Sequence, residues 1–112
     1  MTNPLPAQVT VRDVPALIDQ GAALLDVREA DEWAAGHAAA AVHVPLRQLS
    51  LDNLPDGDPL LVVCHVGGRS AMATQALRNA GIPAVDVAGG MAAWEQIGMP
   101  VVTDAGTPGT II

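Results

Sequence analysis

The chain has 112 residues, half of them apolar, which is enough for one domain with its own hydrophobic core. Its net charge is -7, with twelve acidic residues against five basic ones, all of them Arg. This acidic balance argues against nucleic acid or an anionic membrane as a partner. The lack of Lys excludes Schiff-base chemistry and the GxxxxGK[ST] phosphate-binding loop.

Cys64 is the only cysteine, so the chain cannot form an intramolecular disulfide. No CxxC pair or Cys/His cluster predicts a structural zinc site, and we expect neither a metal nor a cofactor. No apolar run approaches the ~18–20 residues of a membrane span, and the N-terminal residues lack the pattern of a signal peptide. We therefore expect a cytoplasmic, reducing setting, in which a lone thiol can work.

Short apolar runs alternate along the chain with segments of helical spacing, punctuated by Gly and Pro. In chain order, the pattern predicts a strand at 9–11, a helix from Asp13 to Gly21, a strand at 23–27, a helix at 29–35, a strand at 41–44, a helical turn at 46–49, a strand at 60–63, a helix from Ser70 to Asn79, a strand at 84–87 and a helix at 90–97.

Strands separated by helices predict βα crossovers, and hence an α/β fold with a largely parallel sheet covered on both faces. The ligand site of such a sheet lies beyond the carboxyl ends of its strands, and Cys64 follows the clearest strand. We assign residues 1–102 to this domain. Residues 103–112, rich in Gly, Thr and Pro, are expected to form a loosely ordered C-terminal tail.

The segment that joins this strand to the next helix has a composition suited to a reactive thiol. It reads Cys64-His65-Val66-Gly67-Gly68-Arg69-Ser70. The helix N-terminus presents unpaired N–H groups, two glycines let the loop aim several amides at one point, and Arg69 adds a positive charge. These features favour a thiolate and the binding of an anion. A buried filler cysteine, the commoner role of a free cysteine, needs none of them.

The sequence resembles the rhodanese family from about Val9 to Val101. The resemblance rests on Leu25-Asp26-Val27-Arg28-Glu29, Glu32-Trp33, Gly36-His37, Val44-Pro45, the CxxGxRS loop from Cys64 to Ser70, and Gly89-Gly90-Met91 with Trp94. It implies a three-layer α/β fold with a central, mostly parallel sheet of five strands. It also implies that Cys64 is the catalytic, sulfur-accepting residue in a cradle of loop amides.

The mechanism that the resemblance implies is sulfur transfer through a persulfide, without cofactor or metal. The Cys64 thiolate attacks the sulfane sulfur of a small anionic donor such as thiosulfate, and a thiol or cyanide then takes the outer sulfur. The residues expected to bind the donor are His65, Val66, Gly67, Gly68, Arg69, Ser70 and Arg28. The leading hypothesis is therefore a thiosulfate sulfurtransferase.

Two other functions remain open at this point. One is a sulfur-relay module whose donor is a protein persulfide, which suits the small size and plain acidic surface. The other is a cysteine phosphatase or arsenate reductase of the same fold. Such relatives have five residues between the cysteine and the arginine, whereas four separate Cys64 from Arg69 here. The shorter loop disfavours this second alternative.

Several further residues have a structural interpretation beside a functional one. Arg28, next to acidic residues, suits an ion pair as well as donor binding. Asp26, inside an apolar run, must be hydrogen-bonded if it is buried. A structural hydrogen bond is the favoured role of His37. His65 lies inside the cradle, where it either contacts the donor or faces solvent.

Other positions are expected to affect packing or turns. Trp33 and Trp94 are interpreted as core or rim packing. Gly89 and Gly90 are expected to allow a tight turn near the cradle. His43 stands where the family usually has Asn, and residues 38–40, all Ala, replace a segment that usually carries Ile, Pro and Gly. These departures leave the path of that connecting turn open.

Overall fold

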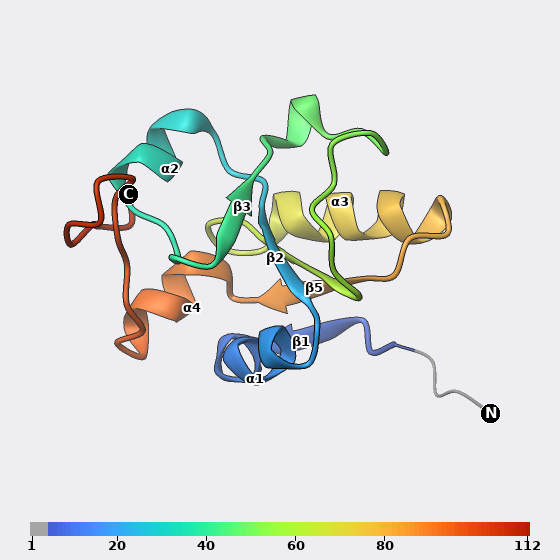
Figure 1. The fold of residues 1–112 in the computed structure, drawn as a ribbon, viewed down its shortest axis with the longest axis horizontal. Coiled ribbons are helices and arrows are strands. Elements are labelled where there is room, and N and C mark those ends of the chain that lie inside the picture. The colour runs from blue at the N-terminus through green and yellow to red at the C-terminus, as the bar shows by residue number, and fades with distance from the viewer. Residues whose placement is uncertain (1–4) are drawn as a thin grey trace.

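The computed structural model describes residues 5–112, and the ribbon in Figure 1 shows a central sheet with helices on either side. In chain order the elements are β1 (Gln8–Thr10), the 3-10 turn η1 (Val11–Asp13), α1 (Val14–Asp19), β2 (Ala23–Asp26), α2 (Ala30–Ala35), β3 (Ala41–His43), the 3-10 turn η2 (Leu46–Gln48), β4 (Leu60–Val63), α3 (Gly68–Asn79), β5 (Ala84–Ala88) and α4 (Gly90–Gln96).

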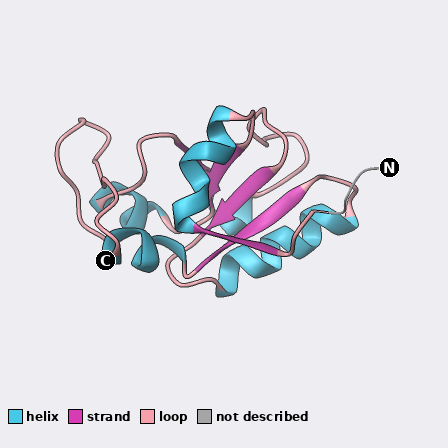
Figure 2. Cartoon of the chain, turned by 90° about the horizontal axis from the view of Figure 1, so that it is seen from below, coloured by secondary structure: helices cyan, strands magenta, loops and turns pink. Residues whose placement is uncertain are grey.

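The five strands form one sheet in the order β1-β5-β4-β2-β3. Every pairing in this sheet is parallel, so the predicted five-stranded α/β fold is confirmed and the sheet is more regular than "mostly parallel". Figure 2 shows the strands running side by side between the helices. Because parallel strands share their direction, the loops that follow β2, β4 and β5 meet at one edge.

Alternating strand residues supply two separate cores, one on each face of the sheet. On one face Leu61 and Val63 of β4 pack with Val14 of α1 and with Met91 and Trp94 of α4. On the other face, Leu60 and Val62 of β4 and the following Cys64 pack with Ala73 and Leu77 of α3. The helix α3 therefore covers this face. The thiol therefore lies on the α3 side of the sheet.

The observed helix start after β4 differs from the expected one. The sequence predicts a helix from Ser70, but α3 begins at Gly68, with Gly67 as its N-cap. Gly67 has φ +131°, a conformation that side-chain-bearing residues rarely adopt, and its carbonyl accepts the N–H of Ala71 at 3.0 Å. This glycine turns the chain into the helix earlier than the serine would.

The first strand also ends one residue earlier than predicted. Val11, expected in a strand at 9–11, instead begins the turn η1, and its side chain is buried in the core. The Asp13 carboxylate accepts hydrogen bonds from the backbone N–H and the hydroxyl of Thr10, at 3.3 and 3.1 Å. Asp13 is the N-cap residue of α1, as the sequence predicts, but its carboxylate makes no capping hydrogen bond to the helix and instead stabilises the turn η1.

Residues 103–112 run beside α2 in Figure 1. The Thr110 N–H donates to Ala35 O at 2.9 Å, and the Gly109 N–H donates to Val101 O at 2.9 Å. Ile111 packs against the core on the α1 and α4 face. The domain boundary at residue 102 and the loose order of the tail stay predictions.

None of the helices in residues 5–112 has the length and apolar character that crossing a bilayer would require.

Candidate functional site

The candidate site begins where β4 ends. Cys64 directly follows this strand and is a free cysteine, only 1% exposed. Its thiol lies under the loop that leads into α3. The backbone N–H of Gly67 donates to the Cys64 Sγ at 3.1 Å. The Cys64 sulfur therefore already accepts one backbone hydrogen bond in this structure.

Ser70, in the first turn of α3, is the second group that contacts the sulfur. The Cys64 S–H donates to the Ser70 Oγ at 3.3 Å, and the Ser70 hydroxyl donates to the carbonyl of Gly67 at 3.2 Å. Ser70 is completely buried. If the thiol loses its proton, the Ser70 hydroxyl can rotate to donate to the sulfur, because a hydroxyl both donates and accepts.

The helix α3 adds a fixed electrostatic contribution. Its twelve residues start at Gly68, so its N-terminal amides and positive dipole end lie beside the Cys64 loop. At both Gly67 and Gly68, a Cβ would meet no atom within 4 Å. No described residue therefore fills the space next to these two glycines. A small anion can approach the amides there.

The beginning of α4 supports the other side of the loop. The N–H groups of Met91 and Ala92 donate to the carbonyls of Cys64 and His65, at 2.8 and 2.9 Å. Gly90 has φ +58°, and a Cβ there would overlap the carbonyl oxygens of the same two residues. The predicted tight turn at Gly89 and Gly90 is present, and its function is to let α4 approach the backbone of Cys64.

Arg69 does not stand free above the loop. Its two terminal nitrogens donate to both carboxylate oxygens of Glu32 on α2, at 2.6 and 2.9 Å. This hydrogen bonding lowers the pKa of Glu32 to about 2, and it raises the pKa of Arg69 above its ordinary value. The negative charge of a Cys64 thiolate also raises the pKa of Arg69, as a smaller cause. The arginine therefore lies near the sulfur while it is held by a carboxylate.

Arg28 lies at the same edge of the sheet but is fully buried. Its Nε and Nη2 donate to the Asp26 carboxylate at 2.8 to 3.0 Å, and Nη2 also donates to Gly36 O at 2.7 Å. Asp26, also fully buried, is hydrogen-bonded as its apolar surroundings require. The ion-pair interpretation of Arg28 thus has its contacts in the structure, while donor binding by Arg28 stays a prediction.

The remaining loop residues differ in exposure. His65 is half-buried, and Val66 is 65% exposed. Met72, which follows on α3, is 67% exposed. Apolar side chains therefore face solvent next to the thiol loop.

In residues 5–112, no group of three or more His, Cys, Asp or Glu side chains is arranged to hold a metal ion.

Two histidines sandwich Trp33 beside this edge. Trp33 stacks on His37 with ring centroids 3.5 Å apart and on His43 with centroids 4.8 Å apart. The His37 Nδ1 donates to the carbonyl of Trp33 at 2.8 Å, and the His43 Nε2 donates to the carbonyl of Arg28 at 2.7 Å. Both histidines thus have structural hydrogen bonds. Trp94 is buried and donates to Pro100 O at 2.9 Å.

One residue that contacts the loop arginine, Glu32, was not predicted to belong to the site. It belongs to the Glu32-Trp33 motif but was given no role, and it lies 37 positions before its partner Arg69. The signal available in the sequence was an acidic residue in the first turn of a short helix near the same sheet edge. Pairing it with Arg69 requires knowing how α2 and α3 meet.

Comparisons with known proteins agree with this geometry. A family model described as "Rhodanese-like domain" matches residues 10–97. A protein of Arabidopsis thaliana named Thiosulfate sulfurtransferase 16, chloroplastic, is 35% identical over 112 residues, covering 86% of this chain and 92% of that protein. The "Putative sulfur carrier protein YrkF" of Bacillus subtilis is 34% identical over 79 residues, covering 68% of this chain and 43% of that protein.

A solved structure gives the same result for the fold. The crystal structure of a rhodanese-related protein from Thermoplasma volcanium superposes with a TM-score of 0.80 at 32% sequence identity. The match covers 88% of this chain and all of that one.

Proposed function

Because the chain belongs to the rhodanese-like domain family, whose matched members include sulfurtransferases and a sulfur carrier, we propose that it transfers sulfane sulfur through a persulfide on Cys64. The observation that carries this proposal is the contact of the Cys64 sulfur with the Gly67 N–H at 3.1 Å and with the Ser70 hydroxyl at 3.3 Å. The Gly67 N–H already donates to this sulfur, and the Ser70 hydroxyl can turn to donate once the thiol has lost its proton. Such donors stabilise a negative charge on the sulfur.

The first step is attack on a small anionic donor, for which thiosulfate is the proposed example. The thiol gives its proton to solvent, and the Cys64 thiolate attacks the sulfane sulfur. The new S–S bond forms as the S–S bond of thiosulfate breaks, and sulfite leaves with the bonding electron pair. The N-terminal amides of α3 lie where they favour the approach of an anion.

The second step returns the enzyme to its starting state. A thiophilic acceptor, a thiolate in a cytoplasmic setting or cyanide in an assay, attacks the outer sulfur of the persulfide. The Cys64 thiolate leaves with the electron pair of the S–S bond. The Gly67 N–H, and the Ser70 hydroxyl once it has turned to donate, can stabilise the charge that returns to the Cys64 sulfur. The cycle is a ping-pong scheme that uses one protein nucleophile.

Cyanolysis with thiosulfate tests this function. Thiocyanate should form with the wild-type protein and not with Cys64→Ser, because serine cannot accept a sulfane sulfur. Equal thiocyanate production by the two proteins would exclude the mechanism. A Cys64→Ser protein with unchanged circular dichroism ensures that the loss is chemical.

A second candidate is a relay module loaded by a protein persulfide. The observation in its favour is the exposure of two apolar side chains beside the loop, Val66 at 65% and Met72 at 67%. Exposed apolar groups around a reactive centre suit contact with another protein. This candidate predicts slow turnover with thiosulfate but ready sulfur loading by a cysteine desulfurase. A phosphatase or arsenate reductase stays the least favoured function, because four residues separate Cys64 from Arg69.

A further inference from the structure

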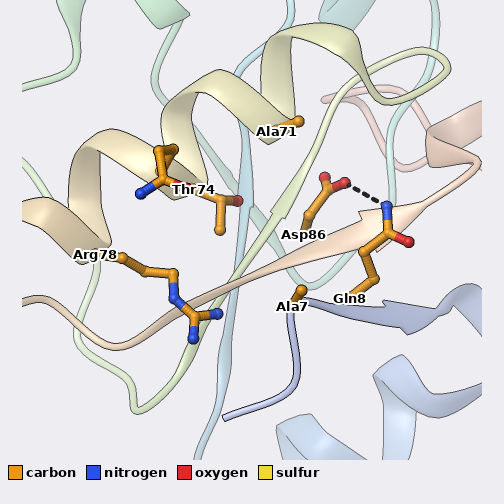
Figure 3. Close-up of a pocket in the computed structure, with 7 residues that line it drawn as sticks. Ala7, Gln8, Ala71, Thr74, Arg78 and Asp86 are labelled. Carbon is orange, nitrogen blue, oxygen red and sulfur yellow. Dashed lines mark hydrogen bonds between the residues drawn. The ribbon is translucent and has the colours of Figure 1, made fainter.

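A second pocket lies on the α3 side of the sheet, and its lining includes none of the residues that contact the Cys64 sulfur. It has a volume of about 460 Å³ and is lined by residues of β1 and the residue before it, of β5 and of α3. Its lining residues are Ala7, Gln8, Ala71, Thr74, Gln75, Arg78 and Asp86. Figure 3 shows that Thr74 on α3 and Asp86 on β5 face this space from opposite sides. Its size suits a small molecule.

Two buried polar atoms in this pocket have no hydrogen-bond partner among residues 5–112. They are the Oδ1 of Asp86 and the Oγ1 of Thr74, in side chains only 3% and 5% exposed. The other carboxylate oxygen of Asp86 accepts the side-chain amide of Gln8 at 3.1 Å (Figure 3). Buried polar groups are rarely left without a partner, because their lost hydration is costly. Both atoms therefore have hydrogen-bonding capacity that no described residue uses.

The chemistry of a group that suits this pocket follows from these oxygens. A carboxylate only accepts hydrogen bonds, and the Thr74 hydroxyl can accept as well. An organic ammonium group has three N–H donors and no acceptor, so it can satisfy both oxygens at once and offset the charge of Asp86. The net charge of -7 adds a general attraction for cations.

Arg78 lies at one end of the pocket and sets a limit on its occupant. Its guanidinium is held by three backbone carbonyls, those of Pro6 and Ala84 through Nη1 at 3.0 and 3.2 Å and that of Leu5 through Nη2 at 3.3 Å. These contacts keep the arginine away from an ion pair with Asp86, since no hydrogen bond joins the two side chains in the described residues. The positive charge opposes a long or doubly charged cation at that end.

We propose that the pocket between α3 and the β1–β5 edge binds a small primary ammonium compound, with its nitrogen between Asp86 Oδ1 and Thr74 Oγ1. The small side chains of Ala7 and Ala71 leave room for the carbon atoms of the ligand. This site uses none of the residues that contact the Cys64 sulfur, so it stands or falls independently of the sulfur chemistry.

Ethanolammonium chloride is a suitable probe, and 1,2-ethanediol is its uncharged counterpart. In an NMR titration at constant ionic strength, ethanolammonium should give saturable shifts of the Gln8, Thr74 and Asp86 amides, and the diol should give none. Asp86→Asn keeps the shape of the side chain but removes its charge, so affinity should fall by about tenfold or more. Asp52→Asn removes an exposed carboxylate elsewhere and should leave affinity unchanged.

Three results would overturn the proposal: no saturable binding to the wild type, equal affinity for the diol, or equal affinity of the wild type and Asp86→Asn. The first of these means that water alone fills the pocket. Should Asp86→Asn fail to fold, Ala71→Leu provides the decisive variant, since Ala71 is an exposed helix residue whose larger replacement fills the pocket. Saturable binding that survives Ala71→Leu unchanged would equally exclude this site.

Discussion

The Arg69 guanidinium and the Glu32 carboxylate form a bidentate ion pair, with nitrogen–oxygen distances of 2.6 and 2.9 Å. Arg69 is thereby bound to α2, a helix in which no residue is fully buried. The pair joins the helix after β2 to the helix after β4. It holds the positive charge in one place near the sulfur.

This ion pair should make stability depend on pH in acid. The pKa of Glu32 is lowered from 4.5 to about 2 in the folded protein, so its contribution is fully present above about pH 4.5 and is lost as the pH falls toward 2. Glu32→Gln should lower the free energy of unfolding at pH 7 by about 1 kcal/mol, since the pair is partly exposed. Urea unfolding at pH 7, 4 and 3 measures the effect.

The difference between wild type and Glu32→Gln should shrink as the pH falls. Asp52→Asn, which removes an exposed carboxylate elsewhere in the chain, is the control for the general effect of losing an acidic charge. A constant difference between wild type and Glu32→Gln from pH 7 to 3 would contradict the assigned role of Arg69 in lowering the Glu32 pKa.

Two adjacent glycines in the loop should respond differently to alanine. Gly67 has φ +131° and Gly68 lies outside the left-handed region, while neither has an atom within 4 Å of an added Cβ. Gly67→Ala should therefore cost about 1–2 kcal/mol of folding free energy through backbone strain alone. Gly68→Ala should be neutral or stabilising, because alanine is the better helix former. Thermal and urea unfolding compare the two; equal losses would refute the role of the Gly67 conformation.

Gly90 should be more sensitive than another glycine of similar backbone conformation. Gly90 has φ +58° and Gly98 has φ +79°, but only at Gly90 would a Cβ overlap backbone atoms, those of Cys64 and His65. Gly98→Ala should cost about 1 kcal/mol from strain, and Gly90→Ala should cost about 2 kcal/mol more because α4 must move away. Gly90→Ala should also slow sulfur loading of Cys64.

The comparison of Gly90→Ala with Gly98→Ala separates strain from close approach. Unfolding experiments give the stabilities, and single-turnover loading gives the rate. Matching stabilities and rates in the two variants would show that the approach of α4 to the Cys64 backbone has no importance.

Replacing Arg28 separates its two interpretations. Arg28→Met leaves the fully buried Asp26 carboxylate without its partner, which should cost about 3–5 kcal/mol. The double variant Arg28→Met with Asp26→Leu should recover much of this loss, because no unpaired charge remains. If Arg28 instead serves the donor alone, stability will stay at the wild-type value and the KM for thiosulfate will rise. Urea unfolding and steady-state kinetics distinguish these results.

The fold was largely predictable because its pattern is local. The runs around Leu61 and Val85 are short, apolar and bounded by turn residues, and such runs at regular spacing indicate parallel strands joined by helices. The helix start at Gly68 was missed because the helical spacing of the sequence begins only at Ser70, whereas the backbone conformation of Gly67 is visible only in three dimensions.

The site was predictable in its centre and less so at its edges. The Cys64–Ser70 segment is contiguous, so its chemistry could be inferred from neighbours in sequence. Contacts between distant segments could not be inferred in this way, as the pairing of Arg69 with Glu32 shows. Asp86, alone in an apolar strand, carried a sequence signal of the same kind as Asp26, but only the structure shows that one of its oxygens lacks a partner in the described chain.

The most direct measurement for the central claim is intact-protein mass spectrometry after incubation with thiosulfate, and separately with a cysteine desulfurase and cysteine. The wild-type protein should gain one sulfur atom on Cys64 with at least one of these donors, and cyanide should remove it. Cys64→Ser should gain none. A wild-type protein that takes up no sulfur from either donor, or that takes it up at a residue other than Cys64, would contradict the persulfide mechanism.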